Sequence, residues 1–170
     1  MKRRQAIQQM VVISAGVALL PACKPSNPYK AYARVPLDLP QRQLLEDFTT
    51  ALLPPRPEVS LPEPATEFML TVLNDCHGPE DIQKFTTGLT QLQEHIKDKY
   101  QTSFAKLSEA QRKEVFADVS KTEGPPEEMQ HFYRTARRLA IEHFTSSEYF
   151  LTNVAHWKFA PGFYDGCTAV

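Results

Sequence analysis

Two cysteines, Cys76 and Cys167, are the residues in the body of this 170-residue chain that most directly suggest a covalent link. Two thiols that meet in an oxidising compartment can form a disulfide. Closing a loop as long as the one between them stabilises a fold by about 4 kcal/mol in the chain-entropy model. The alternative is two unpaired thiols, one of them buried. The sequence leaves both interpretations open.

Histidines and carboxylates could supply metal binding or acid–base chemistry, but their spacing predicts neither. No two of the five histidines stand four residues apart: His77, His95, His131, His143 and His156. His77 follows Cys76, yet no further ligands occur at the spacing of a metal site. The acidic pairs at 80–81 and 127–128 begin predicted helices, where the helix dipole stabilises them. With no G-x-S-x-G nucleophile motif either, we expect no catalytic residue and no metal in this chain.

The composition argues against several other classes. The chain is 42% apolar and 23% charged, as globular proteins are. It contains only 6 Gly, and neither G-x-G-x-x-G nor G-x-x-x-x-G-K-[ST] occurs, so we expect no dinucleotide or P-loop site of the ordinary kind. Its 19 Lys and Arg are balanced by 20 Asp and Glu. Nucleic-acid binding is therefore not expected, because it needs an excess of clustered positive charge.

The N-terminus has the pattern of an export signal, which we assign to residues 1–22. Lys2, Arg3 and Arg4 precede an apolar run at 10–20. At about 1.5 Å per residue this run is too short to cross a hydrocarbon core of about 30 Å, so it is signal-like rather than a membrane anchor. The adjacent arginines resemble a twin-arginine signal, which exports folded proteins. An ordinary basic leader is the alternative, and the export pathway stays open.

Cys23 follows the export signal directly after Pro21-Ala22. The pattern resembles the cleavage box of bacterial lipoproteins. In that chemistry the thiol of the new N-terminal cysteine takes a diacylglycerol, whose chains bind a bilayer at about 0.8 kcal/mol per buried methylene. The alternative is an ordinary signal with a cysteine near its cleavage site. We expect lipidation at Cys23 and a periplasmic or cell-envelope location for a lipid-anchored protein.

The remainder predicts a tether followed by helices. Residues 23–39 are proline-containing and read as an extended tether. Apolar residues then recur at helical spacing, and proline or glycine clusters separate the repeats. No segment alternates with the period of a strand. We expect an all-α domain over 40–170, an irregular bundle of about five helices near 40–53, 64–76, 80–99, 108–119 and 127–143.

Aromatic residues are concentrated in the tail, 145–170, which we expect to be extended. They are Tyr149, Phe150, Trp157, Phe159, Phe163 and Tyr164. One interpretation is that the tail wraps its own bundle and completes the core. The other is a partner interface, because aromatic residues are enriched at the centres of docking surfaces. The two interpretations are compatible.

The order of these elements resembles the gluconate 2-dehydrogenase subunit 3 family, over roughly 40–167. Besides the paired arginines, the segments that carry the resemblance are 51–55 (ALLPP), 65–68 (ATEF), 107–111 (LSEAQ), 150–153 (FLTN) and 161–167 (PGFYDGC). The resemblance implies a non-catalytic small subunit. Such a subunit accompanies the export and maturation of a flavin-dependent, GMC-type sugar or polyol dehydrogenase and docks to it.

The same resemblance implies where the cofactors are. FAD is expected in the large partner subunit, a multihaem cytochrome c subunit often takes the electrons, and this chain holds no cofactor. Two alternatives remain from the residues themselves. One is a stand-alone envelope lipoprotein that binds a protein or a saccharide, and the other is an enzyme in its own right. A subunit with an obligate partner should expose a wide apolar surface, whereas a stand-alone module should not.

Overall fold

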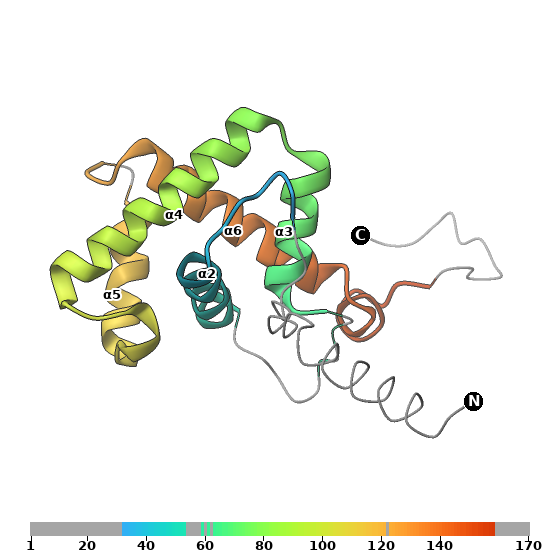
Figure 1. Ribbon diagram of the computed structural model, residues 1–170. Helices are drawn as coiled ribbons and strands as arrows, with labels where there is room; N and C mark the ends of the chain where they lie inside the picture. Colours follow the sequence, from blue (N-terminus) through green and yellow to red (C-terminus); the bar gives the residue numbers. More distant parts are fainter. Residues whose placement is uncertain (1–31, 54–58, 60, 62, 122, 159–170) are drawn as a thin grey trace, which may run out of the picture. The chain divides into compact units, whose positions relative to one another are not determined.

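The computed structural model describes residues 32–53, 59, 61, 63–121 and 123–158, and within these ranges the chain is helical and contains no strand (Figure 1). The all-α prediction is confirmed, and each of the five predicted helices is present with ends that differ by at most two residues. The elements are α2 (Leu39–Leu52), α3 (Ala65–Cys76), α4 (Pro79–Tyr100), η1 (Phe104–Lys106), α5 (Glu109–Val119), α6 (Glu127–Thr145) and η2 (Phe150–Val154).

Local sequence signals explain where the helices begin. The Asp38 carboxylate accepts a hydrogen bond from the Gln41 amide, and the Gln41 side chain accepts one from the Asp38 amide, which forms a capping box before α2. Ser108 and Gln111, whose types and spacing are those of a capping box, form the same reciprocal pair before α5. These bonds satisfy amide groups that a helix start leaves without intrahelical partners. Proline in the first turn helps to start α2 and α4.

The core is built around α6, which α2, α3, α4 and α5 all contact. Phe132 of α6 packs on Phe48 of α2 and Phe85 of α4, with ring centroids 5.3 and 5.0 Å apart, and all three are fully buried. Gly88 explains the close crossing of α4 and α6 that Figure 1 shows. A Cβ atom at Gly88 would lie 2.1 Å from the Glu128 carbonyl oxygen, so no larger residue fits without moving the backbone.

The compact unit begins at Tyr32, earlier than the predicted boundary at residue 40. Tyr32 and Val35 are buried, and the Tyr32 hydroxyl donates to the Glu67 carboxylate at 2.9 Å. The Arg34 guanidinium donates to the carbonyls of Asn74 and His77, at 2.6 and 2.7 Å, and so binds the C-terminal end of α3. The last part of the predicted tether, from residue 32 on, is therefore fastened to α3. Residues 1–31 lie outside the described ranges.

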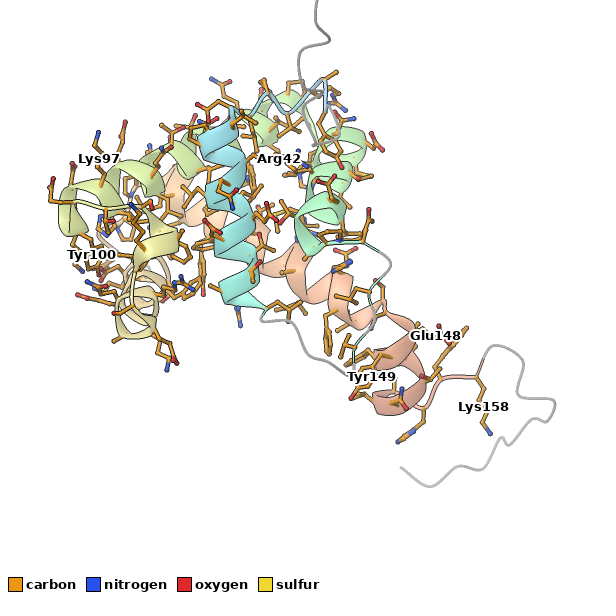
Figure 2. The ribbon with its side chains drawn as sticks, turned by 60° about the horizontal axis from the view of Figure 1, so that its bottom comes forward. Arg42, Lys97, Tyr100, Glu148, Tyr149 and Lys158 are labelled. Carbon is orange, nitrogen blue, oxygen red and sulfur yellow. The ribbon has the colours of Figure 1, made fainter. Side chains whose placement is uncertain are left out.

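A buried ion pair joins α2 to α3. The Arg42 guanidinium, with a side chain only 7% exposed, contacts the Glu67 carboxylate and lies 5.4 Å from the centre of the Tyr32 ring. Figure 2 shows Arg42 on the side of α2 that faces α3. Such a pair is costly to break, because removing one partner leaves the other charged and poorly solvated. Arg42 therefore fixes how the N-terminal segment, α2 and α3 meet.

Candidate docking surface

The structure describes some of the predicted site residues. Tyr149, Phe150 and Trp157 lie within the described ranges, as does Cys76. The remaining predicted residues lie outside them, and their assigned roles stay predictions: Arg3, Arg4, Cys23, Phe159, Phe163, Tyr164 and Cys167. The following site is therefore built from the segment 146–158.

A serine and a π-helical turn redirect the chain after α6. The Ser147 hydroxyl donates to the Phe144 carbonyl at 2.6 Å and accepts from the Phe150 amide at 3.2 Å. The turn η2 follows, and the Ala155 amide closes it on the Phe150 carbonyl at 2.9 Å. The predicted aromatic tail thus starts as a helical turn. π-Helical turns are uncommon and often lie at functional sites.

The chain then reverses over η2. His156 adopts the left-handed conformation, with φ of 51°, and the Trp157 amide donates to the Leu151 carbonyl at 2.8 Å. A positive φ is unusual for a residue other than glycine. Here it allows the amide of Trp157 to turn back onto η2. A backbone hydrogen bond therefore fixes where the backbone of Trp157 lies relative to η2.

The aromatic residues of this segment differ in exposure. Phe150 is half-buried and meets Phe144 of α6 edge-on, with ring centroids 5.6 Å apart. Trp157 and Val154 are each 52% exposed. Figure 2 shows Tyr149 and Lys158 at one end of the unit, with Lys97 and Tyr100 of α4 at the other. Phe150 therefore anchors the segment to α6, while Trp157 and Val154 present apolar surface to solvent.

Cys76 has a different environment from the one its position in the apolar repeat suggested. Apolar residues recur at 65, 68, 69, 72, 73 and 76, which predicts Cys76 on the apolar face of its helix, yet it is exposed at the end of α3. The buried residues of α3 are Thr66, Met69, Leu70 and Leu73, and this helix contacts both α2 and α6. Exposure leaves the Cys76 thiol accessible. The disulfide with Cys167 stays a prediction, because Cys167 lies outside the described residues.

The histidines do not converge on a metal site. Within the described ranges, no three His, Cys, Asp or Glu side chains are grouped as ligands. The His77 Nδ1 lies 3.7 Å from an Asp81 carboxylate oxygen, and the Arg138 guanidinium lies 3.4 Å from its Nε2. His95, nearer the C-terminal end of α4, faces Asp118 of α5 at 3.7 Å. These are pairwise contacts near the surface rather than a cluster of metal ligands.

His143 is the most deeply buried histidine of the described residues. Its ring packs on Phe68 of α3, with centroids 5.0 Å apart, and both ring nitrogens are buried. Burial lowers the pKa of His143, while the charge and backbone of Glu63 act in the opposite direction. The neutral ring is therefore part of the packing between α3 and α6.

A network of surface charges joins α4 to α5. The Lys99 ammonium lies 2.7 Å from both the Glu114 and Asp118 carboxylates, and Lys121 also contacts Asp118 at 2.7 Å. Hydrogen bonds from Lys121 and Lys99 lower the pKa of Asp118 to about 2. A carboxylate with so low a pKa is a poor proton acceptor at neutral pH. The network connects two helices and offers no acid–base catalyst.

A cavity of about 420 Å³ lies between α2, the end of α4 and η1. Leu44, Ile96 and Phe104 contribute its apolar lining, and Asp47 and Lys97 are among the polar residues around it. The lining contains serine and threonine but no histidine, so no nucleophile there has an imidazole base beside it. The cavity can accept an apolar group, yet it lacks the arrangement of a hydrolytic site.

None of the helices in the described ranges is both long enough and apolar enough to cross a membrane. Neither the curated proteins nor the solved structures gave a match to this chain. The sequence matches the family model described as gluconate 2-dehydrogenase subunit 3 over residues 40–162. The matched range includes α3 to α6, nearly all of α2, and the segment with η2 and Trp157. Because this range is most of the chain, the protein belongs to the gluconate 2-dehydrogenase subunit 3 family.

Proposed function

We propose that this chain is a non-catalytic small subunit of a flavin-dependent sugar or polyol dehydrogenase. The family match over residues 40–162 carries the proposal, since the family is named for a subunit of a dehydrogenase complex. The described residues fit such a role, because they are organised to hold a stable helical unit and to present a surface. The chemistry is assigned to a larger, GMC-type partner that binds FAD.

The proposed contact with that partner is the segment after α6. Trp157 is a large side chain that is about half exposed, and the fold gains little from leaving it there. Tryptophan buried at the centre of an interface is a frequent source of binding energy. Val154 adds apolar area on the same segment, and Phe150 fixes the segment to α6. Docking through this segment would bury the apolar surface of Trp157 and Val154, which is exposed in the isolated chain.

In this proposal the other subunits of the complex carry out oxidation and electron transfer. In the proposed complex the flavoprotein oxidises the sugar or sugar acid, and a cytochrome c subunit receives the electrons. The small subunit contributes to the maturation and export of the flavoprotein. Arg3 and Arg4 serve as the export signal, and Cys23 serves as the lipid attachment site. The complex would then lie in the periplasm or cell envelope, held to the membrane by the lipid.

The test is a pull-down of the full-length, tagged protein from its native membranes in mild detergent. The eluate is analysed by mass spectrometry, by its visible absorption spectrum and by dye-linked dehydrogenase activity. A much larger protein that co-elutes with oxidised-flavin absorbance is the expected result. A colourless protein that elutes without a flavoprotein partner would contradict the proposal.

A second candidate function rests on the cavity between α2, α4 and η1. A stand-alone lipoprotein that binds a ligand would use this space, which has an apolar lining and amide side chains such as Gln43 and Gln93 around it. Phe104, the aromatic residue of the lining, is 2% exposed and so offers little stacking surface to a sugar. Calorimetric titration with saccharides distinguishes the two functions: heat of binding that a Leu44→Trp substitution abolishes would favour the stand-alone module.

A further inference from the structure

The outward side of α6 carries three exposed arginines, and two of them, Arg134 and Arg137, form no ion pair with another described residue. The buried residues of α6 form one stripe, which includes Phe132, Ala136, Leu139 and His143. At 3.6 residues per turn, Arg134, Arg137 and Arg138 lie roughly opposite that stripe. All three are exposed. We call Arg134, Arg137 and Arg138 the arginine face of α6.

The arginine face differs from the other arginines that the structure describes. Arg34 binds carbonyls at the end of α3, Arg42 pairs with Glu67, and the Arg112 guanidinium donates to the Ala105 carbonyl at 2.8 Å. In the arginine face, Arg138 contacts Glu142 at 3.2 Å in a solvent-exposed pair. Arg134 and Arg137 enter no ion pair with another described residue.

The close spacing of the three positive charges does not favour the isolated helix. Arg134 is three residues before Arg137 and four before Arg138, and like charges at these spacings repel each other on a helix surface. Guanidinium groups are planar donors that pair with carboxylates through two parallel hydrogen bonds. Arginine is also enriched at protein interfaces, where lysine is depleted. The chemistry of the face therefore points to carboxylates on another protein.

The apolar residues near the face agree with a protein partner. Ile141 is seven residues after Arg134, which returns it to the same side of the helix within about 20°. It is 47% exposed. Val154 and Trp157 follow on the next segment, so three of the four large apolar residues that are exposed in the described ranges lie between 141 and 157. These exposed apolar side chains favour a protein partner, and an anionic lipid surface is the alternative that the vesicle experiment below tests.

We propose that the arginine face of α6 binds an acidic surface of the flavoprotein subunit, beside the contact made by Trp157. The inference rests on the proposed function, since it assigns part of the same interface. In this interface, Arg134 and Arg137 pair with Asp or Glu side chains of the partner, and Ile141 packs against the partner beside these pairs. The apolar segment supplies contact area, and the arginine face supplies orientation and speed of association.

The test reverses the charges in the full-length, tagged protein, expressed in its native host. The variant Arg134→Glu with Arg137→Glu is compared with Lys97→Glu with Lys106→Glu, which changes the net charge equally on α4 and η1. Both control lysines are exposed. Retention of the flavoprotein is measured from its flavin absorbance and dehydrogenase activity, at about 0.05 M and about 0.5 M salt, because screening shortens the range of charge interactions.

The expected result is that the arginine variant retains the flavoprotein at least about tenfold more weakly at low salt, while the lysine variant retains it normally. High salt should reduce the difference. The Arg134→Lys with Arg137→Lys variant should recover part of the retention, because it restores charge without the planar guanidinium. Circular dichroism melting of each variant should match that of the unchanged protein, which separates docking from folding.

Other results would overturn the inference in distinguishable ways. If the unchanged protein and the arginine variant retain the flavoprotein equally, the arginine face is not part of the interface, although the proposed function stands. If the unchanged protein retains no flavoprotein, the proposed function fails and the inference fails with it. Vesicles of phosphatidylcholine with phosphatidylglycerol probe the membrane alternative. Binding of a Cys23→Ser protein that requires Arg134 and Arg137 would assign the face to lipid headgroups instead.

Discussion

The centre of the helical unit and the segment after α6 use the same residue types in opposite ways. In the centre, Phe48 of α2 and Phe85 of α4 both pack on Phe132 of α6, and all three are fully buried. In the segment 146–158, Phe150 is half-buried against α6 and Trp157 is 52% exposed. The first set stabilises the isolated chain, whereas the second leaves apolar surface that only a further partner would cover. Aromatic content alone does not distinguish these roles, but burial does.

The largest expected effect tests the first half of this comparison. Phe48→Ala should lower the free energy of unfolding by about 3–5 kcal/mol, because it opens a cavity between fully buried rings. Chemical denaturation followed by circular dichroism measures the loss. Ile141→Ala is the matched control, since this side chain is 47% exposed and should cost much less. A loss below about 1 kcal/mol for Phe48→Ala would show that the core repacks around the missing ring.

The next effect concerns the polar part of the core. Arg42→Met should destabilise the unit by about 2–3 kcal/mol, less than for a fully enclosed pair because the Glu67 side chain is 23% exposed. Most of this loss comes from leaving the Glu67 carboxylate without its partner. The double variant Arg42→Met with Glu67→Leu should therefore recover at least half of the loss. Equal denaturation midpoints for the single and double variants would contradict this explanation.

The helices of this unit are predictable from sequence because their signals are local. Apolar spacing and proline or glycine clusters locate α2 to α6, and Ser108 with Gln111 marks the start of α5. Contacts between segments far apart in the sequence are not predictable in this way. Nothing near Tyr32 indicates that its hydroxyl meets Glu67, and Arg42 and Glu67 are 25 positions apart, so no local pattern indicates their pairing. For Cys76, the apolar spacing of the helix predicts a place on the buried side of α3, whereas the side chain is exposed.

The candidate site shows the same limit. The sequence identifies Tyr149, Phe150 and Trp157 as aromatic residues in a region that could dock or could complete the core. It does not show that η2 begins at Phe150 and ends before Trp157. A π-helical turn depends on which backbone amide bonds to which carbonyl, and no residue pattern indicates this. The exposure of Trp157 follows from that turn and from the left-handed conformation of His156. The side of α6 that carries the arginines is readable from spacing, whereas the lack of ion-pair partners for Arg134 and Arg137 among the described residues is not.

A third prediction tests the second half of the comparison. Trp157→Ala should change the free energy of unfolding by less than about 1 kcal/mol, since half of the side chain is already in water. Binding to the flavoprotein should weaken by at least about tenfold, because truncation of a tryptophan anchor removes contact area from an interface. Thermal melting and the pull-down measure the two quantities separately. A lower melting temperature with unchanged retention would assign Trp157 to the fold instead.

The smallest expected effect depends on pH and lies where the two regions meet. Burial lowers the pKa of His143 below its usual value near 6.5, so the unfolded chain binds a proton more readily than the folded chain does. Folding stability is therefore fully present above about pH 6.5 and decreases as the pH falls towards the lower pKa of the folded state, by at most about 1.4 kcal/mol per pH unit.

His143→Phe tests this assignment because a phenyl ring preserves the packing on Phe68 and cannot be protonated. Denaturation at several pH values between about 8 and 5 should give a smaller loss of stability for the variant than for the unchanged protein. His131 is the matched control, because burial also lowers its pKa and it lies away from the end of α6. His131→Phe should leave the His143 contribution in place. If retention of the flavoprotein falls with stability only while His143 is present, the packing of α3 on α6 controls the position of the docking segment. If His143→Phe keeps the full pH dependence, His143 does not link the two regions.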